Sequence, residues 1–263
     1  DKPKNTILAP VPGFVMYEMS AQLQGLDFVG VPLTADFELD EAAMLTAIAQ
    51  HQPAITYIAY PNNPTANLWD AGTIKNIIKA CHSYGGIVAL DEAYQPFSSR
   101  TWLTELTANQ TANANVVLMR TLSKFGLAGV RLGYMLGAKM LIEQIDKLRP
   151  PYNVSSLNAE CALFALEHQA VFAAQAELIR TERERLFTRL AALPSVTPFK
   201  SEANMILTRV QDADATFAKL KAAGILVKNV SKMHPLLANC LRLTVGTPQE
   251  NDLLLKELGT DPN

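Results

Sequence analysis

Lys124 stands between two residues that can bind an anion, Ser123 beside it and Arg131 seven positions later. Apolar runs at residues 116–119 and 132–136 enclose this polar stretch. A lysine that is partly desolvated and close to another cation loses its proton more easily and can attack a carbonyl. The spacing therefore predicts a Schiff-base lysine, with Ser123 and Arg131 as a phosphate site. Because an isolated Ser-Lys pair is more often part of a surface loop, this prediction depends on residues elsewhere.

Composition limits the class of protein. The chain has 263 residues, 49% of them hydrophobic, and a net charge of −2. It has no basic run, which argues against nucleic acid as the main partner. No run of eighteen apolar residues and no apolar segment after the first residues is present, so we expect a soluble, cytoplasmic protein that does not enter a membrane. The three cysteines are far apart and are predicted to be buried free thiols, and the scattered histidines predict no metal site.

The first part of the chain alternates between apolar runs and amphipathic segments. We expect strands at 6–9, ending at Pro10, and at 28–31, 55–59, 87–90, 116–119 and 132–136, with helices at 14–23, 40–50 and 70–84. This alternation indicates an α/β fold with a mostly parallel sheet flanked by helices. Ligands bind at the carboxyl ends of such strands, so the polar residues that follow them are the candidates for a site.

The character of the sequence changes after residue 137. Helices are expected at 139–149, 155–168 and 171–193, then strands at 204–210, 225–227 and 240–245 with helices at 213–223 and 249–258. We therefore predict a large domain over residues 1–165, and a smaller α+β domain over 166–263 that includes the long connecting helix.

Asp91 follows the apolar run 87–90, where burial would raise the pKa of its carboxyl unless a cation lies nearby. A magnesium-holding acid is the alternative interpretation. The glycine-rich phosphate loop that accompanies such an acid is missing from the sequence, so this alternative is disfavoured.

Four motifs, taken in order, carry a family resemblance: Pro61-Asn62-Asn63-Pro64-Thr65, Asp91-Glu92-Ala93-Tyr94, Thr121-Leu122-Ser123-Lys124 with Arg131, and Cys240-Leu241-Arg242-Leu243-Thr244-Val245-Gly246-Thr247. With these motifs the chain resembles the fold-type I pyridoxal-phosphate aminotransferases, and most closely those that act on histidinol phosphate. The resemblance runs over nearly the whole chain. It implies the cofactor pyridoxal 5'-phosphate and a role in histidine biosynthesis.

The resemblance also implies roles for individual residues. Lys124 would bind the cofactor aldehyde and move a proton during the reaction, and Asp91 would pair with the pyridinium nitrogen. The other cofactor contacts would come from Asn63 and Tyr94 at the ring oxygen, Phe14 on the ring face, and Ser123 and Arg131 at the phosphate. Arg242 would bind the acidic group of the substrate.

Three positions depart from the family pattern. The spacing between Lys124 and Arg131 is one residue shorter than the corresponding spacing in much of the family. Ala66 stands where a glycine is common. Lys228 stands where a second arginine for the substrate phosphate is often found. A lysine can attract phosphate as a point charge, without the forked geometry of arginine.

The resemblance further implies partners. These are a phosphorylated amino alcohol or amino acid, 2-oxoglutarate, and a second copy of the chain in a homodimer. It also implies an N-terminal segment that is missing here, with a loop for the cofactor phosphate and a tyrosine that reaches the partner subunit. Two alternatives stay open. One is another enzyme of the same fold, either a different aminotransferase or a phospho-amino-acid decarboxylase, and the other is an inactive, truncated remnant.

Overall fold

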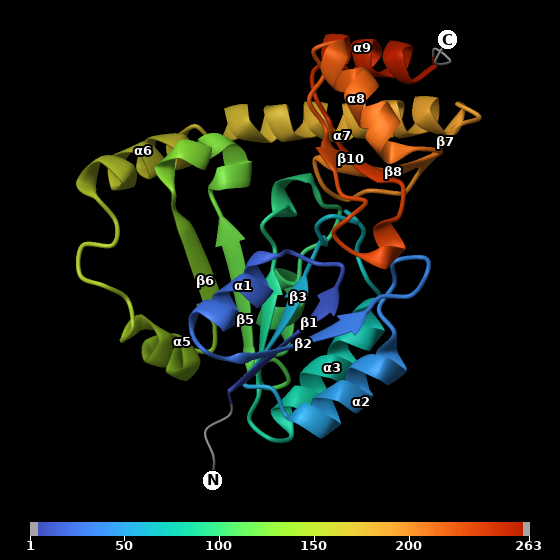
Figure 1. The fold of residues 1–263 in the computed structure, drawn as a ribbon. Helices are drawn as coiled ribbons and strands as arrows, with labels where there is room; N and C mark the ends of the chain where they lie inside the picture. The colour runs from blue at the N-terminus through green and yellow to red at the C-terminus, as the bar shows by residue number, and fades with distance from the viewer. Residues whose placement is uncertain (1–4, 260–263) are drawn as a thin grey trace.

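Six strands form the larger of two sheets in the computed structural model, which describes residues 5–259 (Figure 1). In spatial order they are β2 (Asp27–Pro32), β1 (Thr6–Val11), β3 (Ile55–Ala59), β4 (Ile87–Asp91), β5 (Val116–Thr121) and β6 (Gly133–Gly137). The first five run parallel and β6 is antiparallel to β5. The prediction of a mostly parallel sheet is confirmed, and the carboxyl ends of β3, β4 and β5 lie next to each other.

Buried aliphatic side chains hold this sheet to its helices. Leu90 of β4 and Leu118 of β5 are fully buried in the main core, as expected for strands covered on both faces. The helices α2 (Glu41–His51) and α3 (Ala71–His82) lie side by side against the sheet, and α1 (Met16–Leu23) lies apart from them (Figure 1). The helices α2 and α3 each begin at an aspartate whose side chain accepts a backbone hydrogen bond, which satisfies one free N–H of the first turn.

The segment around β6 carries shorter elements. The helical turn η1 (Gln95–Phe97) and helix α4 (Leu103–Ala108) precede β5, and the turns η2 (Ser123–Leu127) and η3 (Ala128–Val130) join β5 to β6. Two further helices, α5 (Lys139–Asp146) and α6 (Ser156–Glu167), follow β6. The sequence did not predict α4, which has six residues and no side-chain cap.

A helix of 23 residues, α7 (Gln169–Ala191), runs from α6 to the second sheet (Figure 1). That antiparallel sheet has the order β7 (Val196–Pro198), β8 (Met205–Val210), β10 (Cys240–Thr244) and β9 (Lys228–Asn229), with helices α8 (Ala213–Ala222) and α9 (Pro248–Gly259) and the turn η4 (Pro235–Leu237). Its buried residues form a core of their own. These two cores support the division into 1–165 and 166–263, which stays a proposal, although Leu237 and Cys240 of the second part pack in the first core.

Three expectations about local structure were wrong. The strand expected at 225–227 occurs instead at Lys228–Asn229, because Gly224, with a φ of 80°, ends α8 and residues 225–227 lead out of the helix. Strand β1 continues past Pro10, since β3 pairs with β1 only at Ile7 and Leu8 and Pro10 lies beyond that contact. Cys81 and Cys240 are buried free thiols as predicted, but Cys161 is exposed on α6.

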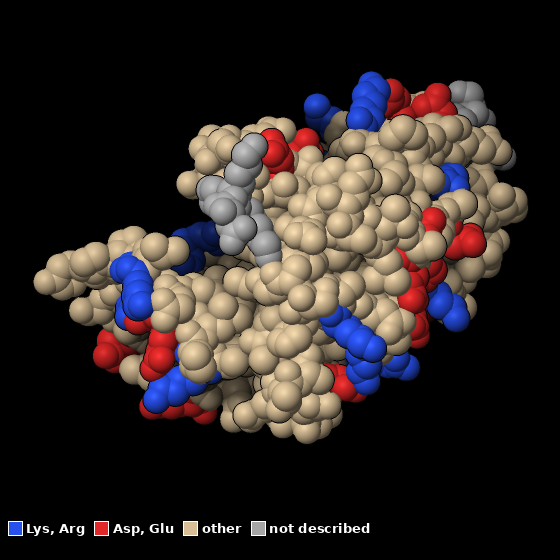
Figure 2. Space-filling view, turned by 90° about the horizontal axis from the view of Figure 1, so that it is seen from below, with Lys and Arg blue, Asp and Glu red and all other residues tan. Residues whose placement is uncertain are grey.

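Charged residues on the face seen in Figure 2 are interspersed by sign, and most of that face is formed by uncharged residues. Among residues 5–259, no helix is both long and apolar enough to cross a lipid bilayer.

Candidate active site

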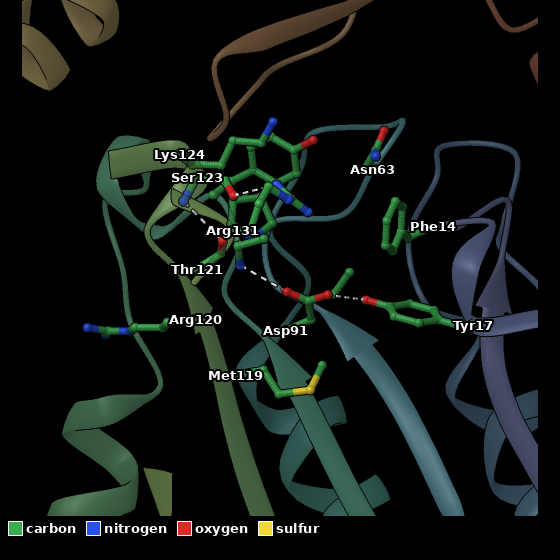
Figure 3. Close-up of a pocket in the computed structure, with 14 residues that line it drawn as sticks. Phe14, Tyr17, Asn63, Asp91, Met119, Arg120, Thr121, Ser123, Lys124 and Arg131 are labelled. Atoms are coloured by element: carbon green, nitrogen blue, oxygen red, sulfur yellow. Dashed lines mark hydrogen bonds between the residues drawn. The ribbon is translucent and has the colours of Figure 1, made fainter. Parts of the chain in front are cut away.

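A cavity of about 390 Å³ lies at the carboxyl ends of β3, β4 and β5 (Figure 3). It contains all seven residues predicted to contact the cofactor or to carry the chemistry. The residues that line it are Phe14, Tyr17, Ala59, Pro61, Asn63, Asp91, Ala93, Tyr94, Met119, Arg120, Thr121, Ser123, Lys124 and Arg131. The convergence expected from a parallel sheet is therefore present.

Asp91 is the last residue of β4, and both oxygens of its carboxylate accept a hydrogen bond. Oδ2 accepts from the Tyr17 hydroxyl at 2.7 Å, and Oδ1 accepts from the backbone N–H of Ala93 at 2.9 Å. Burial raises the pKa of the Asp91 carboxyl, and these two hydrogen bonds partly oppose that shift. The sequence suggested that Asp91 needs a cationic partner, but both of these donors are neutral.

Tyr17 was not predicted to belong to the site. It lies in α1, three residues after Phe14, with its ring stacked on that of Tyr57 at a centroid distance of 4.4 Å. The only indication in the sequence was its helical spacing from Phe14, and this is weak, because an aromatic residue at helical spacing is usually a core residue. Only the register of α1 against the end of β4 brings its hydroxyl to Asp91.

Lys124 lies in the turn that follows β5, and its side chain is half-buried. Gly126 makes this turn possible, because its φ is 117° and a Cβ atom there would come within 2.9 Å of Phe172. The Lys124 Nζ lies 5.3 Å from the centre of the Tyr94 ring. Burial, and then the charge of Arg242, lower the pKa of the Lys124 amine, which increases its neutral, nucleophilic fraction.

Ser123 and Arg131 come from the same segment as Lys124, between β5 and β6, and contact each other. Arg131 Nη1 donates to the Ser123 hydroxyl at 3.3 Å and to the backbone oxygen of Ala128 at 3.1 Å. Thr121 supports this arrangement, since its hydroxyl accepts a hydrogen bond from the backbone N–H of Ser123. Arg131 adopts a left-handed backbone conformation, with a φ of 54°, which turns the chain within the short spacing after the lysine. A cation and a hydroxyl thus meet at one edge of the cavity, as an anion site requires.

Arg242 of β10, in the smaller sheet, is not one of the residues that line the cavity, but it contacts Asn63, which is. Its Nη1 donates to the side-chain oxygen of Asn63 at 2.7 Å, and its buried Nε has no hydrogen-bond partner among the described residues. Since Arg242 occupies the amide oxygen of Asn63, the amide NH₂ group is left as a donor. A buried donor without a partner is costly, so the Nε of Arg242 favours an anionic ligand at this position.

Of the remaining predicted residues, Phe14 lines the cavity and Lys228 does not. Phe14 is 39% exposed and meets Tyr17 edge to face, with ring centroids 5.5 Å apart. Lys228 of β9 is exposed and pairs directly with Arg242 across the antiparallel sheet. Directly paired residues have side chains on the same face of a sheet, so the two cations share a face.

A buried ion pair braces the strands beneath the cavity. The Glu92 carboxylate accepts from Arg120 Nε at 3.0 Å and Nη2 at 2.8 Å, and from the Thr101 hydroxyl at 3.0 Å. It also accepts from the backbone N–H of Trp102. Because Glu92 follows Asp91 and Arg120 precedes Thr121, this pair fixes the ends of β4 and β5 relative to each other.

Known proteins share this sequence and fold. The family described as "Aminotransferase class I and II" matches residues 2–258. A histidinol-phosphate aminotransferase of Methylibium petroleiphilum is 64% identical over 258 residues, which are 98% of this chain and 68% of that protein. One of Polaromonas naphthalenivorans is also 64% identical, over 98% of this chain and 70% of that protein.

Solved structures agree at the level of the fold. The histidinol-phosphate aminotransferase of Clostridium acetobutylicum has a TM-score of 0.88 at 21% identity, covering 97% of this chain and 77% of that one. The enzyme of Sinorhizobium meliloti, solved in complex with pyridoxal-5'-phosphate, has a TM-score of 0.83 at 24% identity, covering 97% of this chain and 69% of that one. The chain belongs to the class I and II aminotransferase family.

Proposed function

We propose that this chain transfers an amino group between histidinol phosphate and 2-oxoglutarate, with pyridoxal 5'-phosphate as its cofactor, in histidine biosynthesis. The observation that carries the proposal is the convergence of Lys124, Asp91 and the Ser123–Arg131 pair on one cavity, in a chain 64% identical to histidinol-phosphate aminotransferases. We further propose that it acts as a cytoplasmic homodimer, as the resemblance implies.

The residues of the cavity fit the cofactor that the family implies. Asp91 presents a buried carboxylate whose two hydrogen-bond donors are both neutral, so a ring nitrogen that becomes cationic would supply the missing counter-charge. Ser123 and Arg131 would hold the phosphate, and Lys124 would hold the cofactor covalently through Nζ. Phe14 would lie on the ring, while the NH₂ of Asn63 and the hydroxyl of Tyr94 would donate to its oxygen. When bound, pyridoxal phosphate supplies an electron sink that stabilises negative charge on the substrate carbon.

Lys124 would act as the general base and acid. Its lowered pKa gives the amine a larger neutral fraction than an ordinary lysine has, and the neutral Nζ can take the proton from the substrate carbon that bears the nitrogen. The same amine, once protonated, can return the proton. The charge of Arg242 favours this neutral form, because Arg242 is one of the two causes that lower the pKa of the amine.

Arg242 and Lys228 would bind the acidic end of each substrate. Histidinol phosphate carries a phosphate group, whereas 2-oxoglutarate carries carboxylates, so one site must accept both kinds of anion. The forked guanidinium of Arg242 suits either anion, and Lys228 on the same face adds a point charge.

A direct assay tests the proposed function. The purified chain, supplied with pyridoxal phosphate, should convert histidinol phosphate and 2-oxoglutarate into equal amounts of imidazole acetol phosphate and glutamate. Histidinol phosphate alone should convert the bound cofactor to its amino form in a single turnover. Release of carbon dioxide from a phosphorylated amino acid, without amino transfer, would identify a decarboxylase instead. A chain that stays colourless with the cofactor would be an inactive remnant.

A further inference from the structure

We propose that Tyr17 is a positioning residue for Asp91, whose hydroxyl holds the carboxylate ionised and turned toward the cofactor ring nitrogen. The inference rests on the proposed function, since it assumes that Asp91 meets that nitrogen. It starts from the hydrogen bond of 2.7 Å between the Tyr17 hydroxyl and Asp91 Oδ2 (Figure 3). This length is typical of a hydroxyl that donates to a charged carboxylate.

The two hydrogen bonds to Asp91 fix its orientation together. Ala93 donates to Oδ1 from the backbone and Tyr17 donates to Oδ2 from a side chain, so rotation of the carboxylate would break both bonds. Each oxygen keeps a further lone pair for a ligand. Of the two donors, only the Tyr17 hydroxyl can be removed without changing the backbone.

Tyr17 is itself held firmly. Its ring is 8% exposed, and it stacks on Tyr57 of β3 with an angle of 6° between the ring planes. Its edge-to-face contact with Phe14 joins it to the residue proposed to cover the cofactor ring. Because α1 and β3 both hold the phenol, the hydroxyl cannot easily turn away from Asp91.

The Tyr17 hydroxyl favours the ionised form of Asp91. Burial raises the pKa of the Asp91 carboxyl, and the hydrogen bond from Tyr17 is the first of the effects that lower it again. The phenols of Tyr57 and Tyr94 face the same carboxylate from β3 and from the segment after β4, while the charge of Arg242 acts on Tyr94 and on Lys124. Burial and Asp91 raise the pKa of the Tyr17 phenol well above its usual range, so it stays a donor at neutral pH.

Loss of the hydroxyl should therefore raise the pKa of the Asp91 carboxyl further. A raised carboxyl pKa means a larger protonated fraction at any given pH, and a protonated carboxyl pairs poorly with a cationic ring nitrogen. Cofactor affinity should then fall, most strongly on the acidic side. The acidic limb of kcat/KM should move to higher pH, while the KM for the amino donor should hardly change.

Tyr17→Phe is the test, with Tyr57→Phe as the matched control, because each removes one hydroxyl from the same ring stack. In the apoprotein, ¹³C NMR of labelled aspartate should show the Asp91 carboxyl titrating at higher pH in Tyr17→Phe than in the wild type. The cofactor dissociation constant should rise about tenfold, as expected for one hydrogen bond to a charged group. With ring-¹⁵N-labelled pyridoxal phosphate, the nitrogen signal should move toward that of a neutral pyridine.

These measurements separate the inference from the proposed function. The titration of Asp91 in the apoprotein needs neither cofactor nor activity, so it reports on Tyr17 even if the amino-transfer assay fails. An unchanged titration in Tyr17→Phe, or an equal change in Tyr57→Phe, would overturn the role of Tyr17. Tyr17→Phe keeps the ring and its stacking, and thermal melts of both variants check that they fold.

Discussion

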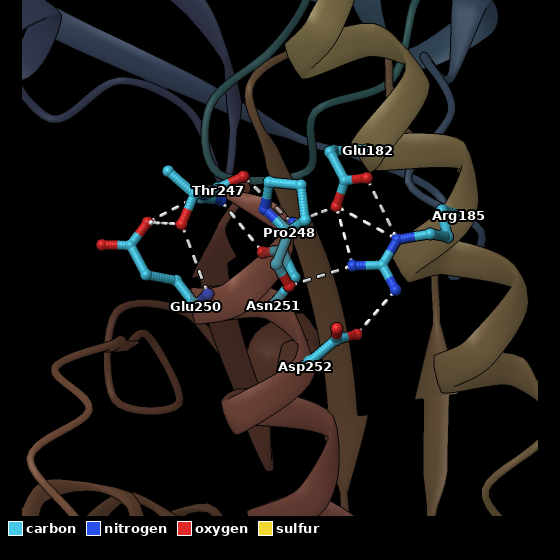
Figure 4. A network of polar contacts seen from close by, with 8 residues as sticks. Glu182, Arg185, Thr247, Pro248, Glu250, Asn251 and Asp252 are labelled. Carbon is cyan, nitrogen blue, oxygen red and sulfur yellow. Dashed lines mark hydrogen bonds and ion pairs between the residues drawn. The ribbon is translucent and has the colours of Figure 1, made fainter.

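Two polar clusters of this molecule shift the pKa of a buried carboxyl in opposite directions. In the cavity, Asp91 has a raised pKa and Lys124 a lowered one, so each shift favours the uncharged form. The second cluster lies between α7 and α9, and its Glu182 carboxylate is paired with Arg185 (Figure 4). We call it the Glu182 network; it consists of Glu182, Arg185, Gly246, Thr247, Pro248, Glu250, Asn251 and Asp252. There Arg185 holds the pKa of the Glu182 carboxyl below its usual range.

The Glu182 network is complete in itself. Glu182 accepts from Arg185 Nη2 at 2.8 Å and from Asn251 Nδ2 at 3.0 Å. Arg185 also donates to Asp252 at 2.6 Å and to the backbone oxygen of Pro248 at 3.1 Å. The amide of buried Asn251 bonds in turn to both backbone groups of Gly246. Such a network fixes the start of α9 against α7 and needs no ligand.

The polar groups at and beside the cavity, in contrast, are not all hydrogen-bonded by the protein. Arg242 has a buried Nε without a partner among residues 5–259, and its charge acts on Lys124, which is also a cation. Arginine thus stabilises the charged form of its neighbour in one cluster and destabilises it in the other. Between these two clusters, the candidate binding site is the one that contains an unsatisfied buried donor and shifts that favour uncharged groups.

The sharpest test of the contrast is Lys124→Ala. Removing a general acid–base group that also holds the cofactor should lower kcat about 10⁴-fold. Stability should hardly change, because the amine is already partly desolvated and gains little from being charged there. Borohydride treatment followed by mass spectrometry should attach the cofactor to the wild type and not to the variant. Lys139→Ala, which changes an exposed lysine, is the control. Covalent attachment to the Lys124→Ala chain would show that another residue holds the cofactor.

Arg242→Gln tests the unsatisfied arginine. Loss of a forked, charge-assisted contact to the substrate should lower kcat/KM about 100-fold, mainly through KM, with little change in cofactor affinity. The pKa of Lys124 should rise toward its ordinary value when the neighbouring charge is removed. Its neutral fraction at a fixed pH should then fall, and its reaction with an amine reagent should need higher pH.

Arg189→Gln, on the exposed side of α7, is the control for loss of an arginine charge. An equal loss of substrate and cofactor affinity in Arg242→Gln would remove this residue from the substrate site.

Glu182→Gln should affect stability alone. The neutral amide cannot pair with Arg185 as a carboxylate does, and we expect a loss of about 1–2 kcal/mol in the free energy of unfolding, since Arg185 keeps some access to water. The pKa of Glu182 is lowered in the fold, so its contribution is present above the ordinary glutamate pKa of about 4.3 and disappears as the pH falls through the folded value. Urea unfolding at several pH values would measure this. A change in cofactor affinity would contradict the separation of the two clusters.

Local sequence predicted most of the fold and the convergence of the candidate site residues on one cavity. Strand β3 was expected at its observed bounds, and Asp40 and Asp70 cap their helices, because runs of apolar residues and capping aspartates act over short distances. Lys124, Asp91 and Asn63 were identified because each lies at or just after the carboxyl end of a parallel strand, and the topology then brings them to one edge.

Contacts between distant segments could not be predicted in this way. Asn63 and Arg242 are 179 positions apart, and their hydrogen bond depends on how the smaller sheet is placed over the larger one. The bond between Tyr17 and Asp91 spans 74 positions and depends on the rotation of α1. Neither placement is encoded in a local pattern. The strand expected at 225–227 failed for a related reason, since its pairing with β10 begins only at Lys228.

The smallest change is expected for Asp91→Asn, measured as the free energy of unfolding of the apoprotein. It compares the two clusters directly, because it removes the buried carboxylate that has no cationic partner. A carboxyl whose pKa is raised in the fold is stabilising below the unfolded aspartate pKa of about 3.9, and this contribution is lost as the pH rises through the folded value. Above that value the wild type keeps an ionised Asp91 buried without a cation bonded to it. An asparagine removes that penalty and can still bond both partners, because its amide oxygen can accept from the Ala93 N–H and its NH₂ group can donate to the Tyr17 hydroxyl oxygen.

We expect Asp91→Asn to stabilise the apoprotein near neutral pH by about 0.5–2 kcal/mol, the usual range for a single stabilising substitution. Urea unfolding should show the gain growing as the pH rises above the unfolded aspartate pKa of about 3.9, in the direction set by the raised pKa of Asp91 in the fold. Asp252→Asn is the control from the Glu182 network, where loss of the ion pair to Arg185 should lower stability slightly. The same Asp91→Asn change should weaken cofactor binding and amino transfer, because the ring nitrogen loses its counter-charge. A variant that is less stable than the wild type at neutral pH would mean that Asp91 is satisfied by the protein alone, as Glu182 is.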